Sequence, residues 1–65
     1  MKKRMMKKLE KLLARYEVET LEELLNSPWH IENVWESDDE EGVMCYELSN
    51  FAILLVKNGE VVDIQ

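Results

Sequence analysis

The sequence is poor in the residues that usually stabilise or punctuate a small domain. Of its 65 residues, one is cysteine, one is histidine, one is proline and two are glycine. A single cysteine excludes an intramolecular disulfide, and one cysteine with one histidine falls short of the four ligands of a closed zinc site. A chain of this length buries only about 60% of the surface that its unfolded form exposes. We therefore expect oligomerisation or partner binding to supplement the core.

Long apolar runs are also missing. The longest run covers residues 51–56, which is too short to span a bilayer core of about 30 Å. Near the N-terminus Glu10 and Lys11 interrupt the leucines, whereas a secretory signal needs roughly 7–15 uninterrupted apolar residues. The sequence therefore predicts a single soluble domain, residues 1–65, located in the cytoplasm, where a lone cysteine stays reduced.

Basic residues are scarce beyond residue 15. Residues 1–15 hold seven basic side chains and one acidic one, and residues 16–65 hold thirteen acidic side chains and one basic one, Lys57. The two segments carry formal charges of +6 and −12, which give the net charge of −6. Because the charges are sorted in this way, one molecule presents a cationic part and an anionic part to its partners.

Hydrophobic periodicity predicts two helices in the first half of the chain. Over about residues 3–16, apolar residues recur with i, i+3, i+4 spacing, and the basic residues fall on the opposite side. This apolar stripe consists of Met5, Met6, Leu9, Leu12, Leu13 and Tyr16. A capping box starts a second helix, about residues 21–26, which ends before Pro28. In the box, the Thr20 hydroxyl is expected to accept from the Glu23 N–H, and the Glu23 carboxylate from the Thr20 N–H.

From residue 29 onward the apolar period changes from 3.6 to 2. This change predicts four strands, at about 29–36, 43–48, 51–57 and 60–64. Asn58 and Gly59 join the last two strands, since a type I′ turn needs positive φ at both of its central residues. We expect an α+β fold in which both helices pack on a four-stranded antiparallel meander, in two layers.

Two-residue turns at Ser49-Asn50 and Asn58-Gly59 would fix the strand register. One face of the sheet would then receive the helices, with Met44, Tyr46, Leu48, Phe51, Ile53, Leu55, Val62 and Ile64. The other face would also be apolar, and one helix of full length cannot cover both faces. The residues of this second patch, through which we expect a homodimer, are Val43, Cys45, Leu54, Val56 and Val61. Alternatively the second helix, Trp29 or Trp35 folds over the patch.

The sequence predicts no catalytic, cofactor-binding or metal-ligating residue. His30 and Glu32 could share a strand face and transfer protons, but no nucleophile or phosphate-binding loop accompanies them, so a surface histidine is expected. Cys45 alternates with hydrophobic residues and is expected to be a buried, unreactive thiol. The acidic run 38–41 fails as a calcium loop, because Ser37 would take its first position and Leu48 its twelfth.

An acidic surface is the feature that predicts a function. We expect its carboxylates to imitate phosphates and to occupy the basic surface of a protein partner, such as a nucleic-acid-binding protein. In size and acidity the chain is similar to nucleic-acid-mimicking inhibitors of phages and mobile elements, including anti-CRISPR and anti-restriction proteins. The resemblance is one of composition, and no motif carries it. The expected surface comprises Glu32, Glu36, Asp38, Asp39, Glu40, Glu41 and Glu47.

Two alternatives to such a small, non-enzymatic regulator or inhibitor remain. In the first, the chain is a homodimeric structural or assembly module without a mimic role. In the second, the basic first helix binds an anionic membrane surface or nucleic-acid phosphates. The second is disfavoured because the apolar stripe is needed to cover the sheet, and because the acidic body would repel nucleic acid.

Overall fold

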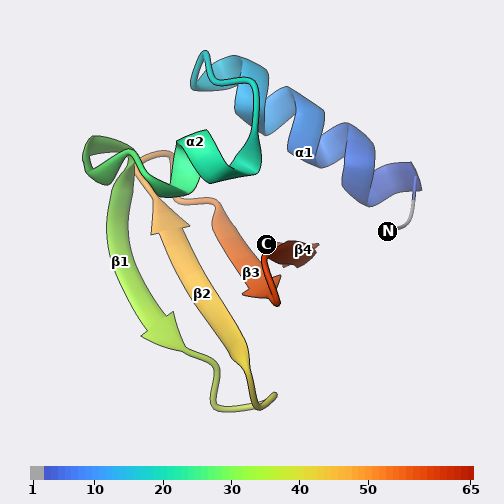
Figure 1. Cartoon of the computed structure of the whole chain (residues 1–65), viewed down its shortest axis with the longest axis vertical. Helices are drawn as coiled ribbons and strands as arrows, with labels where there is room; N and C mark the ends of the chain where they lie inside the picture. Colours follow the sequence, from blue (N-terminus) through green and yellow to red (C-terminus); the bar gives the residue numbers. More distant parts are fainter. Residues whose placement is uncertain (1–2) are drawn as a thin grey trace.

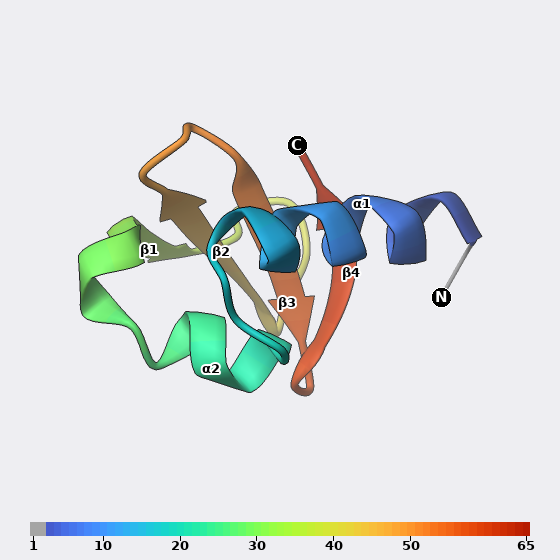
Figure 2. The same cartoon turned by 90° about the horizontal axis from the view of Figure 1, so that it is seen from above.

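The computed structural model describes residues 3–65, and its elements follow the order predicted from the sequence. The four strands form one antiparallel sheet in the order β1-β2-β3-β4, and both α-helices lie on the same side of it (Figures 1 and 2). The predicted α+β meander is confirmed. The elements are α1 (Lys3–Arg15), α2 (Leu21–Leu25), the 3-10 helix η1 (Pro28–His30), β1 (Ile31–Glu36), β2 (Val43–Leu48), β3 (Ile53–Lys57) and β4 (Glu60–Ile64).

Helix α1 packs most of its apolar stripe on the sheet, and Met6, with 48% of its surface exposed, is the exception. Leu12 is buried in the core, and Met5, Leu9 and Leu13 pack against that core. Tyr16 follows the helix and anchors its end, since its hydroxyl hydrogen-bonds Ser49 Oγ over 2.9 Å and accepts from the Asn50 N–H over 3.1 Å. The stripe therefore serves folding, and the basic residues that the structure describes on α1 are exposed.

The predicted N-cap of α2 is confirmed, but the reciprocal half of the capping box is different. The Thr20 hydroxyl accepts from the Glu23 N–H over 3.1 Å. The Glu23 carboxylate accepts from the Glu19 N–H over 3.4 Å, and not from that of Thr20. Leu24, with no exposed surface, is the residue through which α2 joins the core.

The predicted strand 29–36 begins two residues later than expected. Pro28 opens the 3-10 helix η1, because its fixed φ suits the first turn of a helix. The His30 N–H donates to the Ser27 carbonyl over 3.0 Å, which closes this turn. His30 therefore lies in η1, and β1 starts at Ile31.

The β2–β3 connection is longer than the predicted two-residue turn. Leu48 and Ala52 close a three-residue loop, in which the Leu48 N–H donates to the Ala52 carbonyl and the Phe51 N–H to the Leu48 carbonyl. Phe51 adopts φ 71°, the left-handed conformation that completes a type I turn in such loops. The extra residue shifts β3 by one position, so that Tyr46 pairs with Leu54 and Cys45 with Leu55.

This shift exchanges the two faces of β3. Leu54 and Val56 lie under the helices, and Ile53 and Leu55 lie on the open face, the reverse of the prediction. A bulge in β4 likewise moves the partner of Leu55 from the predicted Val62 to Asp63. The predicted helix-facing set is thus wrong at Phe51, Ile53, Leu55 and Val62. The core consists of Leu12, Leu24, Leu48, Leu54, Val56 and Val61.

Candidate functional site

The open face of the sheet is a small apolar strip with a polar border. Trp35, Cys45, Leu55 and Asp63 stand in register across the four strands. Cys45 is buried with 6% exposure, as the sequence predicted, whereas Trp35 is 40% exposed. The neighbouring row is mostly polar, and it comprises Asn33, Glu47, Ile53 and Gln65.

The predicted second patch does not exist as one surface. Leu54, Val56 and Val61 belong to the helix-facing core, and only Val43 and Cys45 lie on the open face. The physical reason is the three-residue β2–β3 loop, because a shift of one residue turns every side chain of a strand to the other face. A homodimer through these five residues together is therefore not supported by the fold.

A hollow of about 240 Å³ lies on the open face beneath the β1–β2 loop. Cys45, Ile53 and Leu55 supply apolar lining from the sheet, Trp35 adds its indole, and the loop adds carboxylates. An aromatic ring next to carboxylates suits a cationic group, since the ring face and the negative charges both attract it. The lining residues are Trp35, Ser37, Asp38, Asp39, Cys45, Ile53, Leu55 and Gln65.

The predicted acidic residues gather on β1 and the loop that follows it. Residues 32–41 contain six acidic side chains and no basic one, and all six are exposed. Within the loop, Ser37 Oγ accepts from the N–H groups of Asp39 (3.2 Å) and Glu40 (3.3 Å), which orders the acidic turn. The seventh residue, Glu47, lies on β2, where its Oε1 accepts from Asn33 Nδ2 over 2.7 Å.

Apart from Lys57, the basic residues that the structure describes lie at the other end of the molecule. Lys57 ends β3, and its side chain reaches Gly42 in the β1–β2 loop, beside the acidic residues. Helix α1 sits at the top of Figure 1, while the β1–β2 loop forms the lower end, and the longest axis runs between them (Figure 1). The view from above agrees, with α1 nearest and that loop farthest (Figure 2). Lys2 lies outside the described residues. The exposed cations of α1 include Arg4, Lys7, Lys8, Lys11 and Arg15.

His30 is held by contacts with Trp29 and Tyr16 and lies apart from Glu32. Its Nε2 accepts from the Trp29 indole N–H over 3.1 Å, and its ring lies 4.5 Å from that of Tyr16 between centroids. Because His30 belongs to η1 and a register irregularity follows Ile31, it does not share a strand face with Glu32. The ring is half-buried and packs as a structural side chain.

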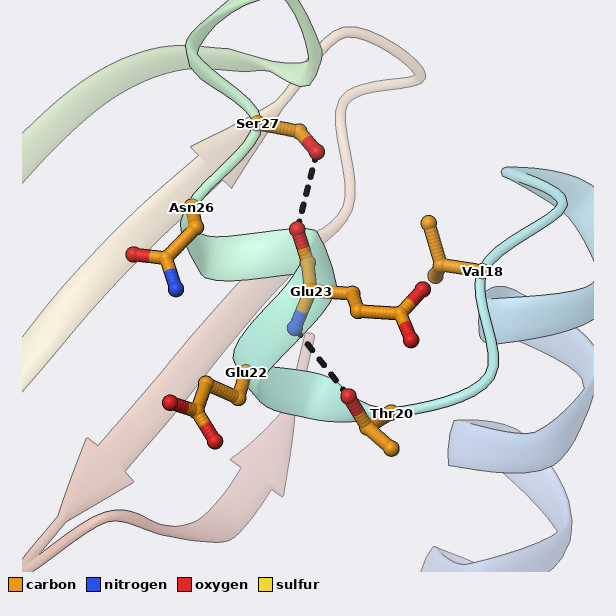
Figure 3. Close-up of a pocket in the computed structure, with 6 residues that line it drawn as sticks. All are labelled: Val18, Thr20, Glu22, Glu23, Asn26 and Ser27. Carbon is orange, nitrogen blue, oxygen red and sulfur yellow. Dashed lines mark hydrogen bonds between the residues drawn. The ribbon is translucent and has the colours of Figure 1, made fainter.

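A second hollow, of about 510 Å³, lies beside α2 (Figure 3). The close-up shows Thr20 bonded to the Glu23 N–H, and Ser27 Oγ donating to the Glu23 carbonyl over 2.8 Å. These polar groups bond one another and thereby hold the two ends of a five-residue helix. The polar groups in this hollow are therefore the capping groups of α2, and Val18, Glu22 and Asn26 line its sides.

Sequence reasoning missed the exposed aromatic residues. Trp29 exposes 74% of its surface and Phe51 exposes 84%. The segments that contain them are joined by a hydrogen bond from the Ser49 N–H to the His30 carbonyl. Trp35 was expected either in a strand or over the patch, and it instead lines the acidic hollow. The β1–β2 pairing of Trp35 with Cys45 decides this position, and no local pattern in the sequence reveals it.

Among residues 3–65, no group of three or more histidine, cysteine, aspartate or glutamate side chains is placed to hold a metal ion. Within the same residues, no helix combines the length and apolar character needed to cross a membrane. Comparisons with protein-family models, curated proteins and solved structures gave no match.

Proposed function

We propose that this protein is a small, non-enzymatic regulator or inhibitor that presents its acidic surface to a basic protein partner, of the kind that binds nucleic acid. The observation that carries the proposal is the cluster of six exposed carboxylates on β1 and the β1–β2 loop, four of them consecutive at residues 38–41. This run holds six acidic residues and no basic one, and Lys57 beside Gly42 is the single cation that the structure of residues 3–65 places against the loop. The net negative field therefore attracts a cationic partner and repels nucleic acid itself. The lone reduced cysteine fits a cytoplasmic location.

The hollow beside Trp35 supports the same partner chemistry. A lysine or arginine side chain entering it would meet Trp35, Asp38 and Asp39, which line it. Such a contact adds specificity to a surface that otherwise works by charge. The acidic run and the hollow share the β1–β2 loop, so one partner can engage both.

A self-assembling module is the second candidate. The cationic α1 and the acidic loop lie at opposite ends of the folded molecule, an arrangement that favours head-to-tail contacts between copies. The membrane alternative loses its support, because the apolar stripe of α1 packs on the sheet. Light scattering at low and high salt distinguishes the second candidate, since head-to-tail assemblies held by charge dissociate as salt rises.

Neutralising the acidic loop should abolish most of the binding to a basic probe. The variant carries Asp38→Asn, Asp39→Asn, Glu40→Gln and Glu41→Gln, and the probe is a labelled poly-arginine peptide. At roughly 0.5 kcal/mol for each exposed ion pair, the loss is about 2 kcal/mol, or about 30-fold in Kd. Mimicry further predicts that a DNA duplex and the protein compete for this peptide.

The matched control removes four acids elsewhere, which tests position against net charge. Glu10→Gln, Glu17→Gln, Glu19→Gln and Glu22→Gln change the formal charge from −6 to −2, as the loop variant does. All four residues are exposed, and we expect a less than fivefold loss, since they lie outside the surface. Equal losses in both variants would mean that only net charge matters, and the proposal would be wrong.

A further inference from the structure

Strand β1 is an uncovered edge of the sheet. Among residues 3–65 it pairs only with β2, and five of its six residues are exposed. The opposite edge is protected, because β4 contains a bulge and contacts α1. An open edge carries a row of backbone donors and acceptors, which can pair with an added strand.

The outward-facing backbone groups of β1 can be assigned from one hydrogen bond. The Ser37 N–H donates to the Val43 carbonyl over 2.9 Å, which makes these residues a hydrogen-bonded pair with β2. In an antiparallel ladder such pairs alternate, so Trp35 also faces β2 while Val34 and Glu36 face outward. Their N–H and C=O groups form the free edge, and the Val34 side chain is itself 49% exposed.

The charges of β1 select the strand that this edge accepts. In an antiparallel pairing of two β1 strands about Val34, Glu32 of each copy would stand opposite Glu36 of the other. Like charges placed opposite one another destabilise a pair of strands, whereas opposite charges stabilise it. A second copy is therefore repelled, and a basic strand is favoured.

We infer that an extended, lysine- or arginine-bearing segment of the partner adds to the sheet as an antiparallel neighbour of β1. The inference rests on the proposed function, since it specifies how the acidic surface holds its basic partner. The partner residue opposite Trp35 lies on the open face, where a lysine or arginine stacks on the indole beside the hollow. The residue opposite Val34 lies on the other face and is apolar.

A pair of peptides separates strand addition from attraction by charge alone. The first is acetyl-Thr-Lys-Lys-Val-Thr-Lys-Thr-amide, which in antiparallel pairing sets lysine opposite Glu36, Trp35 and Glu32 and valine opposite Val34. The second is the same peptide N-methylated at every backbone amide. Methylation keeps the charge but removes the N–H donors, so we expect a loss of at least about tenfold in affinity for the wild-type protein. Fluorescence anisotropy of labelled peptides measures both affinities.

The outcomes distinguish the two proposals. If both peptides bind equally well, strand addition is wrong, while the proposed charge-based function stands. If neither binds, the proposed function itself fails. A β1-mediated dimer in solution, lost in Val34→Pro, would overturn the inference by making a second copy the occupant.

Variants at Val34 test the same edge from the side of the protein. Val34→Pro removes one outward N–H and keeps the bonds to β2, whereas Val34→Thr keeps the N–H and the branched side chain. We expect Val34→Pro to bind the unmethylated peptide about fivefold or more weakly than Val34→Thr, and both to bind the methylated one equally. Equal affinity of the folded variants for the first peptide would contradict the inference. If Val34→Pro fails to fold by circular dichroism, the peptide pair alone decides.

Discussion

Leu54→Ala should lower the free energy of unfolding by about 2–5 kcal/mol, the range for a large side chain removed from a packed core. Leu54 has no exposed surface and lies under the helices, opposite Tyr46 on β2 and Ile64 on β4. A domain of this length has a total stability of roughly 3–10 kcal/mol. Urea unfolding followed by circular dichroism would therefore show a large decrease in the free energy of unfolding, or no cooperative transition at all.

Leu55→Ala is the matched control, because it makes the same chemical change one residue along the strand. Leu55 lies on the open face and is only partly buried, so we expect a loss of about 1 kcal/mol. The comparison tests the register itself. The two-residue turn expected from the sequence would place Leu55 in the core and Leu54 outside. If Leu55→Ala lowered the stability more than Leu54→Ala does, that predicted register would be the correct one.

Leu12→Ala should cost about 2–4 kcal/mol, because it removes the most deeply buried side chain of α1. With Leu12 gone, α1 keeps Met5, Leu9 and Leu13 as contacts, all of them only partly buried. We expect lower stability in urea, together with a loss of helical signal before the sheet unfolds. This result would show that the apolar stripe of the basic helix is used within the molecule.

Lys11→Ala is the control on the exposed side of the same helix. Lys11 is exposed, and surface substitutions usually change stability by less than about 0.5 kcal/mol. If Leu12→Ala were equally harmless, α1 would not rest on the sheet in solution. Its apolar face would then be available to a membrane, and binding to anionic vesicles would become the test to make.

Elements with a strong local signal could be predicted from the sequence. The stripe of α1 has one period throughout, and Asn58-Gly59 adopts positive φ at both residues, as its turn type requires. The ends of β2 and β4 were also predicted. The β2–β3 loop was not, because Phe51 takes a left-handed conformation that is unfavourable for any residue with a β-carbon. Ser49 and Asn50 bond Tyr16 instead, a contact across 33 residues of sequence that no local pattern contains.

The candidate site, too, could be predicted from the sequence only in part. Exposed carboxylates in residues 32–41 follow from composition, since six acidic residues in ten positions cannot be buried. The hollow depends on Trp35, Leu55 and the loop meeting on one face, and this follows from the register of three strands. One misplaced residue in a turn was enough to move the predicted apolar patch into the core.

We propose that the acidic surface of β1 and the β1–β2 loop binds a basic partner. The most direct test is an NMR titration of the labelled protein with a poly-arginine peptide, read as changes in backbone amide shifts. We expect the largest changes at Val34, at Trp35 and over residues 36–41, with the shifts of α1 unchanged. Changes confined to α1 or to the loop around Phe51, or no changes at all, would contradict this proposal.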